Sequence, residues 1–89
     1  MKEIFQVKVK NDLGLHTRPA TVIVQLLQNC NSEVFFTWKR QTINAKSILG
    51  ILMMAIRKNA KLMVTIDGED SAVVRSSLEK AFDNKFGEG

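Results

Sequence analysis

Hydrophobic and polar side chains alternate at the start of the chain. Within residues 3–10, Phe5, Val7 and Val9 share one face and polar side chains occupy the other, which is typical of a half-buried strand. Three later segments show a similar alternation and are bounded by turn-forming residues. The four predicted strands cover residues 3–10, 34–38, 41–44 and 62–66.

A period of three to four residues predicts helices between these strands. Ala20, Ile23, Val24 and Leu27 form the stripe of a helix that packs on a sheet. Pro19 suits the first turn of this helix, where its missing N–H leaves no bond unmade. The three predicted helices begin at His16 or Thr17, at Ser47, and at Asp70 or Ser71, and they end near residue 28, Met54 and Asp83.

The element order is therefore β-α-β-β-α-β-α, in a single domain of residues 1–89. Short connections suit an antiparallel sheet, and amphipathic helices on one side would cover its apolar face. We expect an α+β fold, an open-faced two-layer β-sandwich with a four-stranded antiparallel sheet and three helices on one face. The tail after about Asp83 is expected to fray.

Composition narrows the class of protein. The 89 residues are 45% hydrophobic and 25% charged, which argues against disorder, and no apolar run approaches the ~20 residues of a membrane span. One cysteine and one histidine exclude an internal disulfide and a His/Cys zinc cluster. The first residues lack the apolar stretch of a signal peptide. We expect a soluble cytoplasmic protein with no metal or cofactor and no membrane insertion.

The charge balance is basic. A net charge of +4 and a pI near 9.5 favour an acidic protein partner or a nucleic acid through long-range attraction. The lysines and arginines are scattered along the chain, however, so most of them are interpreted as a solvated surface. Net charge alone therefore assigns no partner.

The only histidine lies at the predicted start of the first helix, in the segment Gly-Leu-His-Thr-Arg-Pro-Ala of residues 14–20. A helix start binds phosphate because it carries unpaired N–H groups and the positive end of the helix dipole. Arg18, two residues after His16, can bind two phosphate oxygens. Free imidazole has a pKa of about 6.5, so much of it is a neutral nucleophile at cytoplasmic pH. The pattern indicates reversible phosphorylation of His16.

A simpler interpretation is that His16 only caps the helix and that Arg18 is a surface charge. Gly14 and Pro19 favour the phosphate site, because they shape the loop that precedes and enters the helix. The sequence has no Gly-rich nucleotide loop, no carboxylate pair at metal spacing and no second histidine or cysteine base. Other proteins would therefore have to phosphorylate this one, and it is not expected to be an enzyme.

Two motifs together resemble a known family. Residues 16–20 (His-Thr-Arg-Pro-Ala) and 44–50 (Asn-Ala-Lys-Ser-Ile-Leu-Gly) are similar to those of HPr phosphocarriers in the bacterial phosphoenolpyruvate-dependent sugar phosphotransferase system. The resemblance covers nearly the whole chain. It implies that His16 carries phosphate on Nδ1, received from enzyme I and passed to enzyme IIA domains, while Arg18 steadies the phosphoryl group. A carrier that visits several partners is expected to be a monomer.

Ser47 has two interpretations. As an N-cap it would stabilise the second helix by about 0.5–2 kcal/mol, without a capping box, because Gly50 holds the third position. The resemblance implies a regulatory site as well, because in many bacteria an HPr kinase/phosphorylase phosphorylates the matching serine. A phosphate there would gain from the helix dipole and from Lys46, and it would disfavour docking on an acidic partner.

The second predicted helix has more apolar side chains than one inner stripe needs. They are either core and singly exposed residues or part of a docking patch beside His16. HPr-like proteins dock through such a patch, which Arg18 and Lys46 would rim here. The predicted partner-binding residues are Thr17, Ile48, Leu49, Leu52 and Met53.

The predicted turn between the second and third strands departs from the family, which usually has Asn-Gly or a similar glycine pair there. Lys39 and Arg40 hold this place, and because positive φ is costly for both we expect a longer or differently shaped loop. Asn59 is expected to adopt the left-handed conformation. Trp38 is expected in the core, and Phe35 is expected to be exposed.

Two other functions fit parts of the sequence. A regulatory HPr relative would act in a nitrogen-type phosphotransfer chain or mainly through Ser47, although the presence of both His16 and Arg18 counts against a serine-only regulator. A small basic RNA-binding α+β domain would suit the pI and the aromatic residues of the second strand. The aromatic pattern of RNA recognition motifs is absent from the sequence, so RNA binding is the weakest of the three hypotheses.

Overall fold

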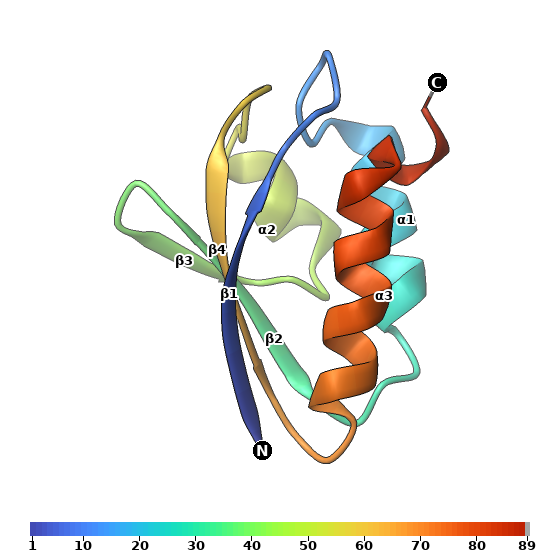
Figure 1. Cartoon of the computed structure of the whole chain (residues 1–89). Helices are drawn as coiled ribbons and strands as arrows, with labels where there is room; N and C mark the ends of the chain where they lie inside the picture. Colours follow the sequence, from blue (N-terminus) through green and yellow to red (C-terminus); the bar gives the residue numbers. More distant parts are fainter. Residues whose placement is uncertain (89) are drawn as a thin grey trace.

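A computed structural model describes residues 1–88. Its four strands form one antiparallel sheet in the order β1-β4-β2-β3, and helices cover one face of this sheet (Figure 1). The predicted α+β open-faced sandwich is confirmed. The elements are β1 (Lys2–Lys8), α1 (Thr17–Leu27), β2 (Glu33–Trp38), β3 (Gln41–Asn44), α2 (Ile48–Met53), β4 (Lys61–Asp67), α3 (Ser71–Asp83) and the short 3-10 helix η1 (Lys85–Gly87).

The alternation along the strands sets the two faces of the sheet. The central strand β4 pairs with β1 and β2, with Phe5 opposite Val64 and Val34 opposite Ile66. These four side chains are buried. Met63, between two inward residues of β4, is 39% exposed on the other face, so a period of two separates core from surface.

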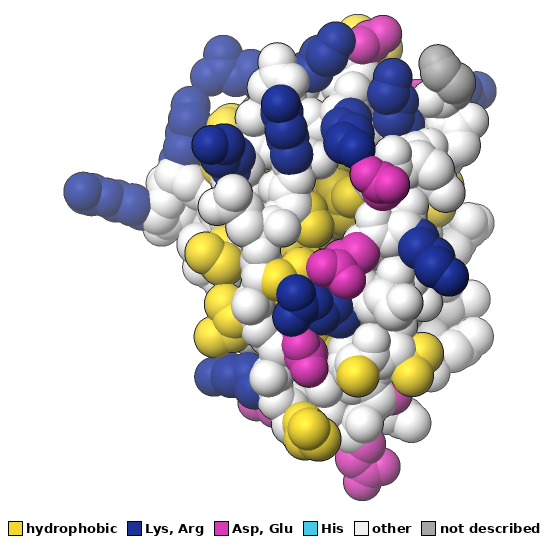
Figure 2. All heavy atoms as spheres, in the orientation of Figure 1, with side chains coloured by type: hydrophobic (Ala, Val, Ile, Leu, Met, Phe, Trp, Pro, Cys, Tyr) yellow, Lys and Arg dark blue, Asp and Glu magenta, His cyan; other side chains and the backbone are white. Residues whose placement is uncertain are grey.

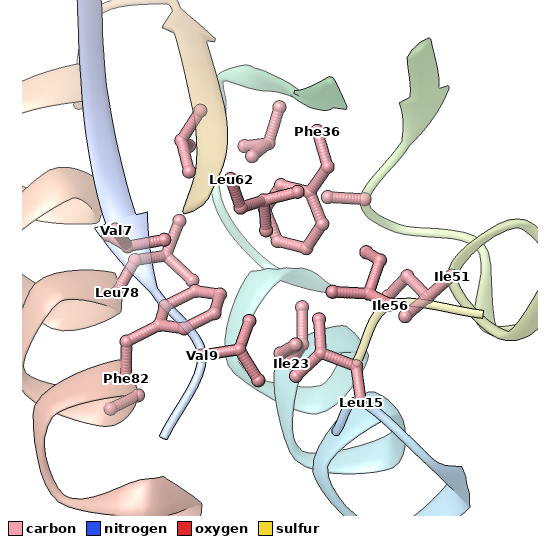
Figure 3. Packing of buried hydrophobic residues seen from close by; sticks show 14 of the residues in the cluster. Val7, Val9, Leu15, Ile23, Phe36, Ile51, Ile56, Leu62, Leu78 and Phe82 are labelled. Atoms are coloured by element: carbon pink, nitrogen blue, oxygen red, sulfur yellow. The ribbon is translucent and has the colours of Figure 1, made fainter. Parts of the chain in front are cut away.

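The core lies between the sheet and the helices (Figure 3). From α1, Ala20, Ile23 and Leu27 are completely buried, as the predicted stripe requires, and Val24 is partly buried against the same cluster. The inner face of α3 contributes four buried side chains in the predicted positions. They are Val74, Leu78, Ala81 and Phe82.

The turn between β2 and β3 corrects the prediction of a longer loop. Trp38 pairs directly with Gln41, so Lys39 and Arg40 form a two-residue turn with φ of 49° and 66°. The ammonium of Lys39 lies 4.6 Å from the centre of the Trp38 ring, a cation–π contact that offsets part of the backbone strain. Trp38 itself is only partly buried.

The C-terminal tail, for which the sequence predicts fraying after about Asp83, packs against the sandwich in this structure. Phe86 is buried, and its ring packs edge-on against Phe82 with centroids 4.8 Å apart. Lys85 and Phe86 both have positive φ, 58° and 54°, a conformation that costs about 1–2 kcal/mol per residue. Burial of the aromatic ring offsets this cost and holds the tail against the sandwich.

Smaller expectations have mixed outcomes. Asn59 has φ of 72°, which confirms the predicted left-handed conformation. Phe35 is half-buried on its strand, so the prediction of an exposed aromatic is wrong. Within residues 1–88, no helix is both long enough and apolar enough to cross a membrane.

Candidate phosphoryl-acceptor site

The loop before α1 is held by contacts that bring His16 to the surface. Leu15 donates its N–H to the carbonyl of Ile56 at 3.0 Å, and Gly14 donates to Asn11. Gly14 has φ of +66°, and a Cβ at this position would overlap the Ile56 carbonyl oxygen. Only glycine therefore allows the two segments to approach this closely. These contacts fix the direction in which the loop enters α1.

His16 is the N-cap residue of α1, but its side chain makes no capping hydrogen bond. Within residues 1–88, the amides of Thr17 and Arg18 have no hydrogen-bond acceptor, and Pro19 has no N–H. The first turn of α1 contains no acidic residue. An uncapped helix start of this kind binds an anion favourably.

The ring of His16 faces a carboxylate from the C-terminal tail. Its Nε2 lies 2.9 Å from Oε2 and 3.1 Å from Oε1 of Glu88, which is 72 positions later in the chain. The two side chains are 32% and 21% exposed. No hydrogen bond to Nδ1 occurs within the described residues 1–88. The two ring nitrogens therefore have different environments.

Asn11 positions this carboxylate. Its side chain is almost fully buried, and Nδ2 donates both to Oε1 of Glu88 at 2.5 Å and to the backbone carbonyl of Lys85 at 2.9 Å. The hydrogen bond from Asn11 is the main cause that lowers the pKa of the Glu88 carboxyl below its ordinary 4.5, and the positive charges of His16 and Arg18 lower it further. Glu88 is therefore ionised at neutral pH.

Arg18 and Lys85 line the same open pocket as His16 and Glu88, with a volume of about 420 Å³. Arg18 is exposed and makes no ion pair within the part of the chain that the structure describes. Its guanidinium donors are thus available to an incoming anion. Lys and Arg side chains gather on the upper half of the molecule in Figure 2, where Figure 1 places the C-terminal tail.

Ser47 lies at a second helix start and differs from His16. It is exposed, and its hydroxyl oxygen accepts the N–H of Gly50 at 3.0 Å, so Ser47 is a side-chain N-cap of α2. The ammonium of Lys46 lies 3.4 Å from the carbonyl oxygen of Cys30. Lys46 is therefore directed toward the end of α1 in this structure.

The predicted apolar patch is partly exposed. Leu49 and Met53 are 67% and 75% exposed, and Ile48 is 38% exposed. Leu52 instead packs partly buried against the core. Thr17 is exposed at the start of α1, and α1 and α2 contact each other. Leu13, which the sequence did not single out, is 76% exposed and lines the His16 pocket.

Comparisons with known proteins agree with this fold. Residues 4–84 match the family model PTS-HPr, described as the phosphotransferase-system HPr component phosphorylation site. The chain is 41% identical to the phosphocarrier protein HPr of Chlamydia pneumoniae over 80 residues, which cover 90% of this chain and 74% of that protein. It is 37% identical to HPr of Treponema pallidum over 82 residues, 92% of this chain and 93% of the relative.

Solved structures give the same result. The crystal structure of HPr-C-His from Thermoanaerobacter tengcongensis superposes with a TM-score of 0.93 at 29% identity and covers 98% of both chains. HPr from Bacillus anthracis gives a TM-score of 0.86 at 30% identity, over 91% of this chain and 96% of the other. The chain belongs to the HPr family of phosphocarrier proteins of the phosphotransferase system.

Sequence patterns missed two residues at the site, Glu88 and Asn11. Glu88 lies in a polar, glycine-flanked tail with no periodicity, and Asn11 looks like an ordinary turn residue. Phe86 is the one sequence signal that could have indicated a packed tail. A large aromatic side chain after the last helix either packs against the core or stays exposed to solvent, and burial is favourable. Their contact with His16 depends on tertiary structure.

Proposed function

We propose that this protein is a histidine phosphocarrier of the cytoplasm that acts as one HPr-like domain and as a monomer. Nδ1 of His16 accepts a phosphoryl group from enzyme I, which takes it from phosphoenolpyruvate, and returns it to enzyme IIA domains. The observation that supports this most is the position of His16 at an uncapped helix start, in the same pocket as Arg18, which is exposed and has no ion-pair partner among residues 1–88. The chain serves as a covalent intermediate and not as an enzyme.

The electrostatics of the pocket suit a transferring phosphoryl group. The free amides of Thr17 and Arg18 and the positive end of the α1 dipole attract the phosphoryl oxygens. The guanidinium of Arg18 adds a planar, bidentate donor. The helix fixes the two amides in place, so they stabilise charge in the transition state without rearrangement.

The docking surface of the carrier comprises Thr17 and the α2 side chains Ile48, Leu49, Leu52 and Met53. Exposed apolar groups near a basic rim suit partners with an acidic rim and an apolar groove. Leu49 and Met53, the most exposed of the group, would contribute most of the contact. Leu52 would contribute mainly by supporting its neighbours from below.

Regulation at Ser47 is a second proposed activity of the same chain. Its exposed hydroxyl is accessible to an HPr kinase/phosphorylase, and a phosphate on it would place negative charge within the docking surface. Such a charge repels an acidic partner. Incubation with ATP and this kinase tests the proposal, and Ser47→Ala is the matched control that should remain unlabelled.

The carrier function is tested by intact mass after incubation with phosphoenolpyruvate, magnesium and enzyme I. The wild type should gain one acid-labile phosphoryl group, and His16→Ala should gain none. No gain with an enzyme I that phosphorylates another HPr would contradict the transport function. Light scattering of the same samples should give the mass of a monomer.

A further inference from the structure

The contact between Glu88 and His16 assigns a second role at the site, which rests on the proposed carrier function. An ionised carboxylate can only accept hydrogen bonds. Both of its oxygens lie within 3.1 Å of Nε2 of His16, so Nε2 must carry the hydrogen. In the neutral ring the lone pair is then on Nδ1.

We propose that Glu88 is a positioning residue, which holds His16 in the tautomer whose Nδ1 is the nucleophile. Asn11 holds Glu88 in turn. Because Nδ2 of Asn11 faces two acceptors, the Lys85 carbonyl and Oε1 of Glu88, the opposite amide orientation would place oxygen against oxygen. The direction of each hydrogen bond is therefore fixed: Asn11 donates to Glu88, and Nε2 of His16 also donates to Glu88.

Contacts within the C-terminal tail hold the Glu88 carboxylate in place. Phe86, two residues before Glu88, is buried against Phe82 although its backbone is left-handed. The N–H of Glu88 donates to the carbonyl of Lys85 at 2.9 Å. A strained backbone persists only where the surrounding structure determines it, and here that structure places Glu88 over Nε2.

This arrangement lets phosphoryl transfer occur without moving a proton. The Nδ1 lone pair attacks phosphorus of the phosphorylated donor protein, the N–P bond on His16 forms, and the donor's bond to phosphorus breaks with its electron pair returning to the donor. The hydrogen on Nε2 stays in its bond to Glu88. The ring becomes a phosphoimidazolium whose positive charge faces the carboxylate. Donation to the next protein reverses these steps.

The tautomer is measured directly by nitrogen-15 spectroscopy of the His16 ring in the neutral, unphosphorylated protein. The wild type should show a protonated Nε2 and an unprotonated Nδ1. Glu88→Ala removes the acceptor and should give a mixture of both tautomers. Glu69→Gln is the matched control, because Glu69 is exposed in the turn before α3 and its replacement removes the same charge far from the ring.

The same variants are then compared in phosphorylation by enzyme I. Loss of a charge-assisted hydrogen bond at the ring should slow Glu88→Ala by about tenfold, while Glu69→Gln keeps the wild-type rate. Wild-type ring signals in Glu88→Ala, or a rate equal to that of the control, would overturn the proposal. A wild type that accepts no phosphoryl group contradicts the carrier function instead, and the ring signals still test the role of Glu88 independently.

Discussion

The starts of α1 and α2 both have an extended N-cap residue, but the two N-cap side chains bind different groups. His16 and Ser47 are both N-cap residues with extended backbone. The hydroxyl of Ser47 accepts the N–H of Gly50, whereas the ring of His16 turns away to Glu88 and leaves the first amides of α1 free. A helix start whose cap binds elsewhere is open to an external anion, while a capped start contributes to stability.

The largest difference between the two starts is expected in phosphoryl transfer. Arg18→Ala removes the only side-chain cation next to His16 in α1 and should lower the rate of phosphorylation by about 10²-fold, as for a lost transition-state donor. Arg18→Lys should restore only part of the rate, because an ammonium lacks the planar fork. Rapid-quench kinetics with enzyme I measures both rates. Equal rates for Arg18→Ala and the wild type would show that the open start alone binds the phosphoryl group.

A second prediction concerns the C-terminal tail, whose Glu88 contacts the ring of His16. Phe86→Ala should destabilise the protein by about 3 kcal/mol, the usual cost of removing a buried aromatic ring. It should also release Glu88, so that the ring of His16 shows both tautomers. Urea unfolding gives the free energy, and ring spectroscopy in the native state gives the tautomers. Leu13→Ala is the control, because Leu13 lines the same pocket but is largely exposed.

The capped start should show its effect in stability. Ser47→Ala removes the acceptor of the Gly50 N–H and should lower the free energy of unfolding by about 1 kcal/mol. Ser47→Asp keeps an acceptor there and should recover most of that loss. Urea unfolding midpoints measure the series. Because the cap is far from the Nε2 contact in sequence and has no hydrogen bond to it, Ser47→Ala should leave the His16 ring signals unchanged.

The smallest effect is expected at the start of α3, where Asp70 binds the hydroxyl of Ser32 and the N–H of Asn31. The bond from Ser32 is the main cause that lowers the pKa of Asp70 below its ordinary 3.8. A lowered pKa in the folded state stabilises the protein above the unfolded value, and this contribution is lost as pH falls through the folded pKa. The Tm difference between the wild type and Asp70→Asn should therefore be constant near neutral pH and shrink below about pH 4. A difference that grows on acidification would contradict the assignment.

Much of the sandwich was predictable because its signals are local. The alternation in β1 and the stripe of α1 each lie within about ten residues, and the motif from His16 to Ala20 identifies its own helix start. The errors occur where distant contacts override local preference. The turn at Lys39 and Arg40 keeps positive φ because the pairing of Trp38 with Gln41 leaves only two residues to join the strands.

The tail shows the same limit at the functional site. Polarity and glycine predict fraying after Asp83, and no local pattern indicates that the ring of Phe86 packs on that of Phe82. That contact brings Glu88 to His16 across 72 positions of sequence. Local patterns thus single out His16 as the candidate acceptor but not Glu88, which reaches its ring only in the folded chain.

The most direct test of the difference between the two ring nitrogens is the site of phosphorus attachment. Nitrogen-15-labelled protein, phosphorylated by enzyme I, should show one-bond phosphorus–nitrogen coupling at Nδ1 of His16. The amide signals of Thr17 and Arg18 should shift at the same time, because their N–H groups face the phosphoryl oxygens. Coupling at Nε2, or unchanged signals for both amides, would contradict the account of an open helix start with Nε2 held by Glu88.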